Sequence, residues 1–173
     1  MSGIGGQGVQ LAASVLARAA LAEGREVQMF GSYGGMMRGG NTEATVVVAD
    51  GPIESPPTVG TTWSGILMHH DYSEPTVRRL RDGSIVLINS SVFGPFEANG
   101  FHVVEVPATD EAIEAGNVMG ASMVMMGAYA AVTELVAVDS LCAAVSDALP
   151  SYRSQHVAFN VGALRRGFAL VSP

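Results

Sequence analysis

Apolar residues along the chain follow two alternating periods, one typical of helices and one typical of strands. Over residues 9–23, Leu11, Val15 and Ala19 fall on one helical face, and Gly24 stands where a helix C-cap belongs. Runs of β-branched and apolar residues predict strands at residues 26–30, 43–49, 66–69, 84–89 and 101–106. This alternation of helical and strand-like segments predicts an α/β sheet.

The last third of the chain is predicted to be helical, over residues 111–115, 118–136, 140–148 and roughly 154–168. Earlier, Ser73 is suited to cap a helix that has Pro75 in its first turn and is expected to close at Gly83. No internal repeat, linker or low-complexity tract divides the sequence. A single domain over residues 1–173 is therefore predicted.

The composition narrows the classes of function. Charged residues make up 14% of the chain, against roughly 25% in an average soluble domain, and hydrophobic residues make up 48%. Such sparse charge indicates that other subunits cover part of the surface. The net charge is −7 and basic residues rarely cluster, so we do not expect nucleic-acid binding.

The single cysteine, Cys142, excludes an intrachain disulfide, an iron–sulfur cluster held by cysteines of this chain, and a structural zinc site of several cysteines. No secretory signal is visible, and the most apolar run, residues 118–133, is shorter than the about 18 residues that a membrane span requires. These observations predict a cytoplasmic protein without a membrane span.

The run Gly3-Ile4-Gly5-Gly6-Gln7-Gly8 satisfies the G-x-G-x-x-G spacing. Glycines there allow a tight turn and a close approach to an anion, at which the following helix points its N–H groups. A dinucleotide site also needs an acidic residue at the end of the second strand, and Met29-Phe30-Gly31-Ser32 offers none. We therefore do not expect NAD binding. Two readings stay open: a tight turn without a ligand, or a site for another anion or a pantetheine-like ligand.

Only Met1 and Ser2 precede this glycine loop, although such a loop normally follows the first strand of a sheet. Either the first strand is trimmed, or one strand of the sheet comes from elsewhere in the chain.

A second glycine-rich run, Gly31-Ser32-Tyr33-Gly34-Gly35-Met36-Met37-Arg38-Gly39-Gly40, surrounds one tyrosine and one arginine. So many glycines make a loop that can lie flat against a ligand or a partner chain. Arg38 is the only charge in this run. Its guanidinium can either hold a carboxylate or phosphate, or bond backbone carbonyls and so shape the loop.

The run His69-His70-Asp71 has the composition of a metal cluster. Adjacent histidines on a strand point to opposite faces, however, so they cannot share one ion unless the strand has ended. With no obvious third ligand, we predict no metal site. Their place at the carboxyl end of a predicted strand leaves contact with a ligand or partner open.

Asn117 is a good N-cap for the methionine-rich helix that follows it. Gly120 and Gly127 lie two turns apart on one face of that helix, which allows close packing against the sheet or another chain. Cys142 is expected to be a small core residue. We find no Ser-His-Asp constellation or carboxylate pair, so no catalytic residue is assigned.

Both glycine runs carry a resemblance to a known family. The run Ser2-Gly3-Ile4-Gly5-Gly6-Gln7-Gly8-Val9, and then Ser32-Tyr33-Gly34 with Met37-Arg38-Gly39-Gly40, resemble the gamma subunit of 2-oxoacid:ferredoxin oxidoreductases. The likeness continues in Ile53-Glu54-Ser55-Pro56, in Asn117 with Gly120 and Gly127, and in Ala158-Phe159 with Gly162. The tyrosine in the second loop looks most like the 2-oxoglutarate and branched-chain oxoacid types.

This resemblance implies a Rossmann-like domain, with a mostly parallel sheet and helices on both faces. It implies a complex that decarboxylates a 2-oxoacid on thiamine diphosphate, passes electrons through iron–sulfur clusters to ferredoxin or another acceptor, and releases acyl-CoA. Thiamine diphosphate and the clusters would belong to alpha, beta and possible ferredoxin-like delta subunits. This chain would shape the coenzyme A side, bind no cofactor alone and be inactive in isolation.

The residues expected to contact a ligand or a partner are Gly3, Gly5, Gly6, Gln7, Gly8, Ser32, Tyr33, Arg38, Gly39, Gly40 and Asn117. Two other functions remain as alternatives. One is a stand-alone nucleotide- or CoA-binding module that uses the same first loop, and the other is a purely structural subunit whose apolar surface serves only assembly.

Overall fold

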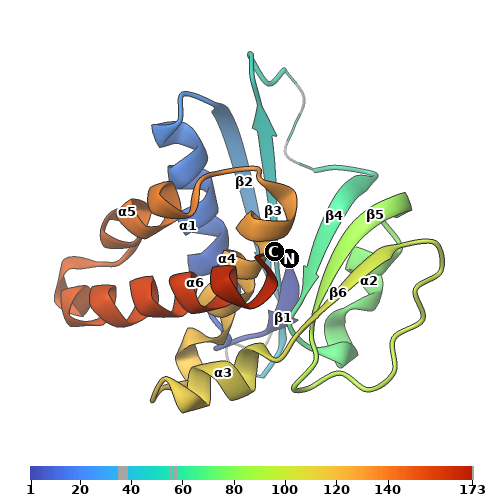
Figure 1. Ribbon diagram of the computed structural model, residues 1–173. Coiled ribbons are helices and arrows are strands. Elements are labelled where there is room, and N and C mark those ends of the chain that lie inside the picture. Colours follow the sequence, from blue (N-terminus) through green and yellow to red (C-terminus); the bar gives the residue numbers. More distant parts are fainter. Residues whose placement is uncertain (35–38, 55, 57, 173) are drawn as a thin grey trace.

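A computed structural model of the chain describes residues 1–34, 39–54, 56 and 58–172. The strands are β1 (Ser2–Ile4), β2 (Glu26–Tyr33), β3 (Asn41–Ala49), β4 (Thr62–Leu67), β5 (Leu80–Asn89) and β6 (His102–Val106). The helices are α1 (Val9–Ala22), α2 (Glu74–Val77), α3 (Ala108–Glu114), α4 (Ala121–Thr133), α5 (Val138–Ala148) and α6 (Val157–Val171). The predicted α/β fold is confirmed (Figure 1).

The six strands form one mixed sheet in the order β2-β3-β1-β4-β5-β6. Strands β1, β4, β5 and β6 run parallel, whereas β3 is antiparallel to both of its neighbours, β1 and β2. The antiparallel half arises because only residues 34–40 join β2 to β3, and a connection this short is below the dozen or so residues that a parallel crossover needs. Among the described residues, the pairings β1–β4, β4–β5 and β5–β6 are parallel and two pairings are antiparallel. The expected mostly parallel sheet is therefore confirmed, with an antiparallel strand, β3, on one side of it.

The two faces of the sheet are covered unequally. On one face, α1, α4 and α6 bury a large core that includes Val15, Met123 and Leu164. On the other face, Leu67, Val86 and Ile88 are covered by α2 and by apolar side chains of the segment between β5 and β6. Figure 1 shows the long helices gathered on one side of the sheet, with the short α2 on the opposite side. Helices thus lie on both faces, as expected, but one face carries most of the core.

Helix α1 begins and ends at glycines with positive φ. Gly8 precedes the helix at φ 79°, and Gly24 follows it at φ 81°. The N–H of Arg25 donates to the Ala20 carbonyl and closes the last turn. This is the predicted glycine end of a helix, since only glycine adopts the left-handed conformation without strain.

The predicted helix from Ser73 to Gly83 is wrong beyond its first turn. Helix α2 ends at Val77, and β5 has begun by Leu80 because the N–H of Thr62 donates to the Arg79 carbonyl and draws the chain into the sheet. Gly83 lies inside β5 at φ 76° and marks an irregularity of the strand rather than a helix end.

Helices α4 and α6 cross in direct backbone contact. A Cβ atom at Gly127 would overlap the Leu164 carbonyl, and one at Gly167 would overlap the Val124 carbonyl. The predicted close packing at Gly120 and Gly127 is confirmed, but its partner is α6 of the same chain rather than the sheet or another chain. Two glycines facing each other's helix allow this approach because neither carries a side chain.

Strand β1 lies at the centre of the sheet and is only three residues long. The glycine loop therefore does follow a strand. Past Met1, β3 and β4 have no strand between them in the part of the chain that the structure describes. A cavity of about 120 Å³ lies there, lined among others by Val46, Val48, Trp63 and Tyr129.

The amine of Met1 closes one end of this cavity and donates to the Ala44 carbonyl oxygen at 2.9 Å. Burial, and secondarily the charge of Arg79, lowers the pKa of this amine to about 5. None of the helices among the described residues is both long and apolar enough to cross a membrane.

Candidate functional site

The first glycine loop is closed by the side chain of Gln7. Its Oε1 accepts from the N–H of Ile4 at 2.8 Å, and its Nε2 donates to the Met68 carbonyl at 3.4 Å, just beyond β4. A Cβ at Gly3 would lie 2.6 Å from that Oε1 and 2.8 Å from the Met68 Cβ, so only glycine fits there. Gln7 thus positions the loop against the end of β4 instead of projecting toward a ligand.

Gly6 and Gly8 supply the turn into α1. Their φ angles of 108° and 79° lie in the region that other residues adopt only with strain. A Cβ at Gly8 would lie 2.5 Å from the hydroxyl of Ser122, so the loop rests on the first turn of α4. The first turn of α1 holds no acidic side chain, so no carboxylate of its own neutralises the positive end of the helix dipole.

The two predicted glycine loops lie side by side. The N–H of Gly5 donates to the Gly40 carbonyl at 2.8 Å, which joins the first loop to the second. Gly39 has φ 79° and open space around its Cα, and its carbonyl accepts from the Tyr72 hydroxyl at 3.2 Å. Hydrogen bonds therefore join the two loops and the chain after β4 into one continuous surface at this edge of the sheet.

Of the remaining predicted site residues, two lie at the end of a strand and one lies outside the described part of the chain. Ser32 and Tyr33 close strand β2, opposite Glu43 and Thr42 of β3. Arg38 lies outside the residues that the structure describes.

Asn117 caps a 3-10 turn (Val118–Gly120) that leads into α4, and its Oδ1 accepts from the N–H of Met119 at 3.0 Å. The predicted capping role is thus found. Cys142 is half-buried on α5 against the main core, where burial raises the pKa of its thiol. This placement agrees with the predicted packing role of Cys142. The raised pKa keeps the thiol protonated, and a protonated thiol is a poor nucleophile.

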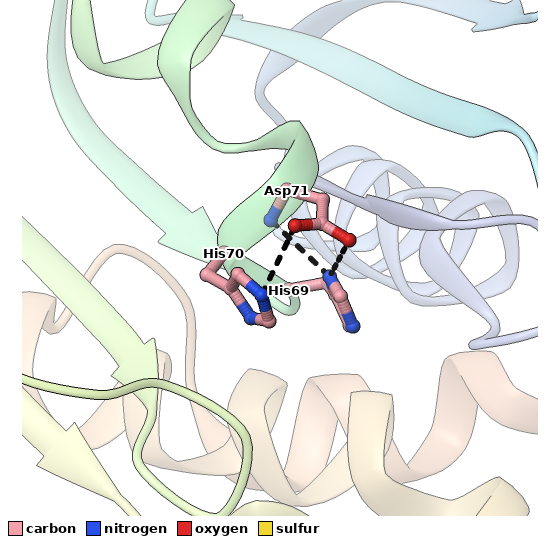
Figure 2. Close-up of side chains that lie close together, drawn as sticks. All are labelled: His69, His70 and Asp71. Atoms are coloured by element: carbon pink, nitrogen blue, oxygen red, sulfur yellow. Dashed lines mark hydrogen bonds and ion pairs between the residues drawn. The ribbon is translucent and has the colours of Figure 1, made fainter.

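A third segment, not predicted to be part of the site, stands beside the glycine loops. Strand β4 ends at Leu67, so His69 and His70 are no longer on a strand, and the rule that adjacent side chains face opposite ways does not apply. Their rings stack with centroids 4.4 Å apart. The Asp71 carboxylate lies 3.0 Å from His70 Nε2 and 3.8 Å from His69 Nδ1. Figure 2 shows the carboxylate facing both imidazole rings.

The pKa of His69 is lowered, chiefly by burial and then by the neighbouring His70, although Asp71 acts in the opposite direction. A lowered pKa keeps the imidazole neutral at pH 7, so a ring nitrogen lone pair remains available. The sequence offered two signals for this cluster. One is its composition of two histidines and one aspartate, and the other is its place at the carboxyl end of a predicted strand.

Similarity to known proteins assigns the chain to a family. The model of the family described as pyruvate ferredoxin/flavodoxin oxidoreductase matches residues 1–170. The chain belongs to this family. A similar protein is the pyruvate synthase subunit PorC of Methanothermobacter thermautotrophicus, which is 32% identical over 154 residues, 86% of this chain and 82% of that protein.

Two solved structures share the fold. The gamma subunit of a keto/oxoacid ferredoxin oxidoreductase from Geobacter sulfurreducens has a TM-score of 0.80 at 24% identity, covering 97% of this chain and 94% of that one. A 2-oxoglutarate:ferredoxin oxidoreductase from Magnetococcus marinus has a TM-score of 0.85 at 22% identity, covering 98% of this chain and 30% of that one. The expectation of a gamma-type subunit of a 2-oxoacid:ferredoxin oxidoreductase is confirmed.

Proposed function

We propose that this subunit shapes the coenzyme A side of the acyl-forming site, while partner subunits hold thiamine diphosphate and the iron–sulfur clusters. The observation that carries the proposal is the bond between Gly5 and Gly40, because it joins two glycine-rich loops into one surface at the start of α1. Such a surface lets a phosphate or a pantetheine chain approach the backbone closely. The Magnetococcus complex has coenzyme A and succinyl-CoA bound, which supports the same ligand class here.

The residues of this chain do not fit the redox cofactors of such a complex. Iron–sulfur clusters are held by several cysteine thiolates, and the sequence has one cysteine, half-buried on α5. We therefore assign the clusters and thiamine diphosphate to alpha and beta subunits and to a possible ferredoxin-like delta subunit. Ferredoxin or another acceptor would take the electrons, and the complex would work in the cytoplasm.

The choice of oxoacid stays with the partner subunits in this proposal. The loop that contains Tyr33 resembles the 2-oxoglutarate and branched-chain oxoacid types of the family. The proteins similar to this chain act on different oxoacids, because they include both a pyruvate synthase subunit and a 2-oxoglutarate:ferredoxin oxidoreductase. Within this chain, the uncompensated positive end of α1 would attract the phosphates of coenzyme A, and the sequence of the second loop offers Arg38 as a further cation.

The test is the exchange of Arg38→Ala in the complex reconstituted with its alpha and beta subunits. We expect the KM for coenzyme A to rise about tenfold with little change in kcat, which corresponds to the loss of one charge-assisted hydrogen bond. The matched control is Arg18→Ala, because Arg18 is exposed on α1 and lies outside both loops. An unchanged KM for coenzyme A in a fully assembled Arg38→Ala complex would contradict the proposed ligand role.

The isolated chain provides a second, independent test. Calorimetric titration should detect no binding of thiamine diphosphate or NAD, and the purified chain should not turn over an oxoacid. Tight NAD binding would favour the stand-alone module instead, and robust decarboxylation by the single chain would overturn the assignment of the cofactors to partner subunits.

A further inference from the structure

We infer that His69, His70 and Asp71 form a binding site for one divalent transition-metal ion, with an open coordination position toward the glycine loops. The three side chains each offer one ligand atom, and these atoms all lie within 4.8 Å of one another. Nitrogen and carboxylate ligands in this combination suit ions of the Zn²⁺ type. The inference concerns the chain itself and does not depend on the coenzyme A proposal.

The nitrogen of His70 that does not face Asp71, Nδ1, fixes the orientation of the ring. Its Nδ1 lies 3.1 Å from the Val92 carbonyl, so in the neutral ring Nδ1–H donates there and Nε2 keeps its lone pair. Such an outer hydrogen bond to a carbonyl is typical of metal-binding histidines, because it sets the tautomer and holds the ring in place. The edge of Phe93 packs against the same ring, with centroids 6.2 Å apart.

This tautomer places two hydrogen-bond acceptors against each other. His70 Nε2 faces Asp71 Oδ1 at 3.0 Å, and the second carboxylate oxygen faces His69 Nδ1 at 3.8 Å. A proton on Nε2 would satisfy only the first of these two contacts. A cation between the three groups satisfies both, since the carboxylate and both nitrogens then bind one centre.

His69 is suited to the same ion. Its Nδ1 accepts a hydrogen bond from the N–H of Asp71, so this nitrogen carries the lone pair that a metal ligand needs. At 3.3 Å this is a long contact, which a metal bond would replace. Donor atoms around Zn²⁺ are about 3 to 3.5 Å apart, and the more exposed side chains of His70 and Asp71 leave room for this small adjustment.

The cluster is tied to the glycine loops on both sides. Gln7 donates to the carbonyl of Met68, immediately before the cluster, and Tyr72, immediately after it, donates to the carbonyl of Gly39. Three protein ligands leave a zinc-type ion at least one open position. We therefore expect that position to accept an oxygen ligand, such as water, a carboxylate or a phosphate.

Titration of the 173-residue chain with Zn²⁺, followed by calorimetry, tests the site directly. We expect one equivalent to bind with a Kd on the order of 1 µM at pH 7.5. His69→Gln, His70→Gln and Asp71→Asn should each weaken binding by about tenfold or more. Far-UV circular dichroism and Tm of each variant would show that the fold is retained.

Matched controls exclude adventitious binding. His102 and His156 are exposed elsewhere on the chain, so His102→Gln and His156→Gln should leave the Kd unchanged, as should Cys142→Ser. Side-chain ¹⁵N NMR should show Zn²⁺ shifting His70 Nε2 and His69 Nδ1 together. The inference is overturned by an absence of saturable binding, by equal losses in control and site variants, or by NMR that shows only a protonated His70 paired with Asp71.

Discussion

Glycine is needed for different reasons in the loops and at the helix crossing. In the loop before α1, Gly6 has φ 108° and nothing within 4 Å of where a Cβ would stand, so its backbone angle alone calls for glycine. At the crossing of α4 and α6, Gly127 has an ordinary helical backbone, but a Cβ there would overlap the Leu164 carbonyl. Gly6 is thus required for its backbone conformation, and Gly127 is required for the short distance between two helices.

This difference shows why the loop can serve a ligand and the crossing cannot. Gly6 is required for its φ angle and has open space beside it, which a ligand or a partner chain can occupy. A glycine chosen for contact has that space already filled by a neighbouring backbone. Gly6 and Gly127 therefore meet two unrelated structural needs, of which only the first leaves room for a ligand.

The largest effect is expected from Gly127→Ala. Its neighbours are backbone atoms of α6, which cannot rotate aside, so the two helices must separate. We expect a loss of about 3 kcal/mol in the free energy of unfolding, or about 6 to 12 °C in Tm. Thermal unfolding followed by circular dichroism measures this.

Gly120→Ala is a milder change than Gly127→Ala and serves as its comparison. The nearest atoms that a Cβ at Gly120 would meet belong to the ring of Phe159, which can shift. The loss should be clearly smaller than for Gly127→Ala. Equal losses would mean that the backbone contact between the helices is not the cause.

A smaller loss, about 1 to 2 kcal/mol, is expected for Gly6→Ala in the loop. The cost here is the left-handed backbone and not a clash, so Gly6→Asn should recover part of it, because asparagine tolerates positive φ better than alanine. Chemical denaturation of the isolated chain gives both values. If Gly6→Asn is as destabilised as Gly6→Ala, the argument from backbone conformation fails at this position.

The smallest effect, with the opposite sign, is expected for Gly162→Ala. Gly162 lies in the middle of α6, is exposed, and has nothing within 4 Å of a Cβ. Alanine should therefore stabilise the isolated chain by about 0.5 to 1 kcal/mol through its higher helix propensity. A destabilised Gly162→Ala chain would show that α6 depends on glycine beyond its crossing with α4.

The sequence predicted those features that depend on neighbouring residues. The end of α1 at Gly24, the cap at Asn117 and the glycine loop before Val9 all follow from local hydrogen-bond and backbone preferences. The segment after Ser73 was misjudged because pairing with β4, a contact distant in sequence, begins strand β5 at Leu80 and overrides a local helix signal.

Other features required the folded chain. The antiparallel pairing of β3, the choice of α6 as the partner of Gly127, and the bond between Gly5 and Gly40 all join residues far apart in sequence. The convergence of His69 and His70 was not predicted because it depends on strand β4 ending at Leu67. Strand ends are set by pairing rather than by the residues themselves, so periodicity alone could not locate this one.

The position of Met1 fixes where any residue joined to its amine would lie. This amine lies between β3 and β4 and bonds to Ala44, in the middle of the sheet and not at its rim. A residue joined to it would therefore enter the space between these two strands, which Val46 and Val48 help to line. Polar residues joined there, such as those of a histidine tag, would bury polar groups against these apolar side chains.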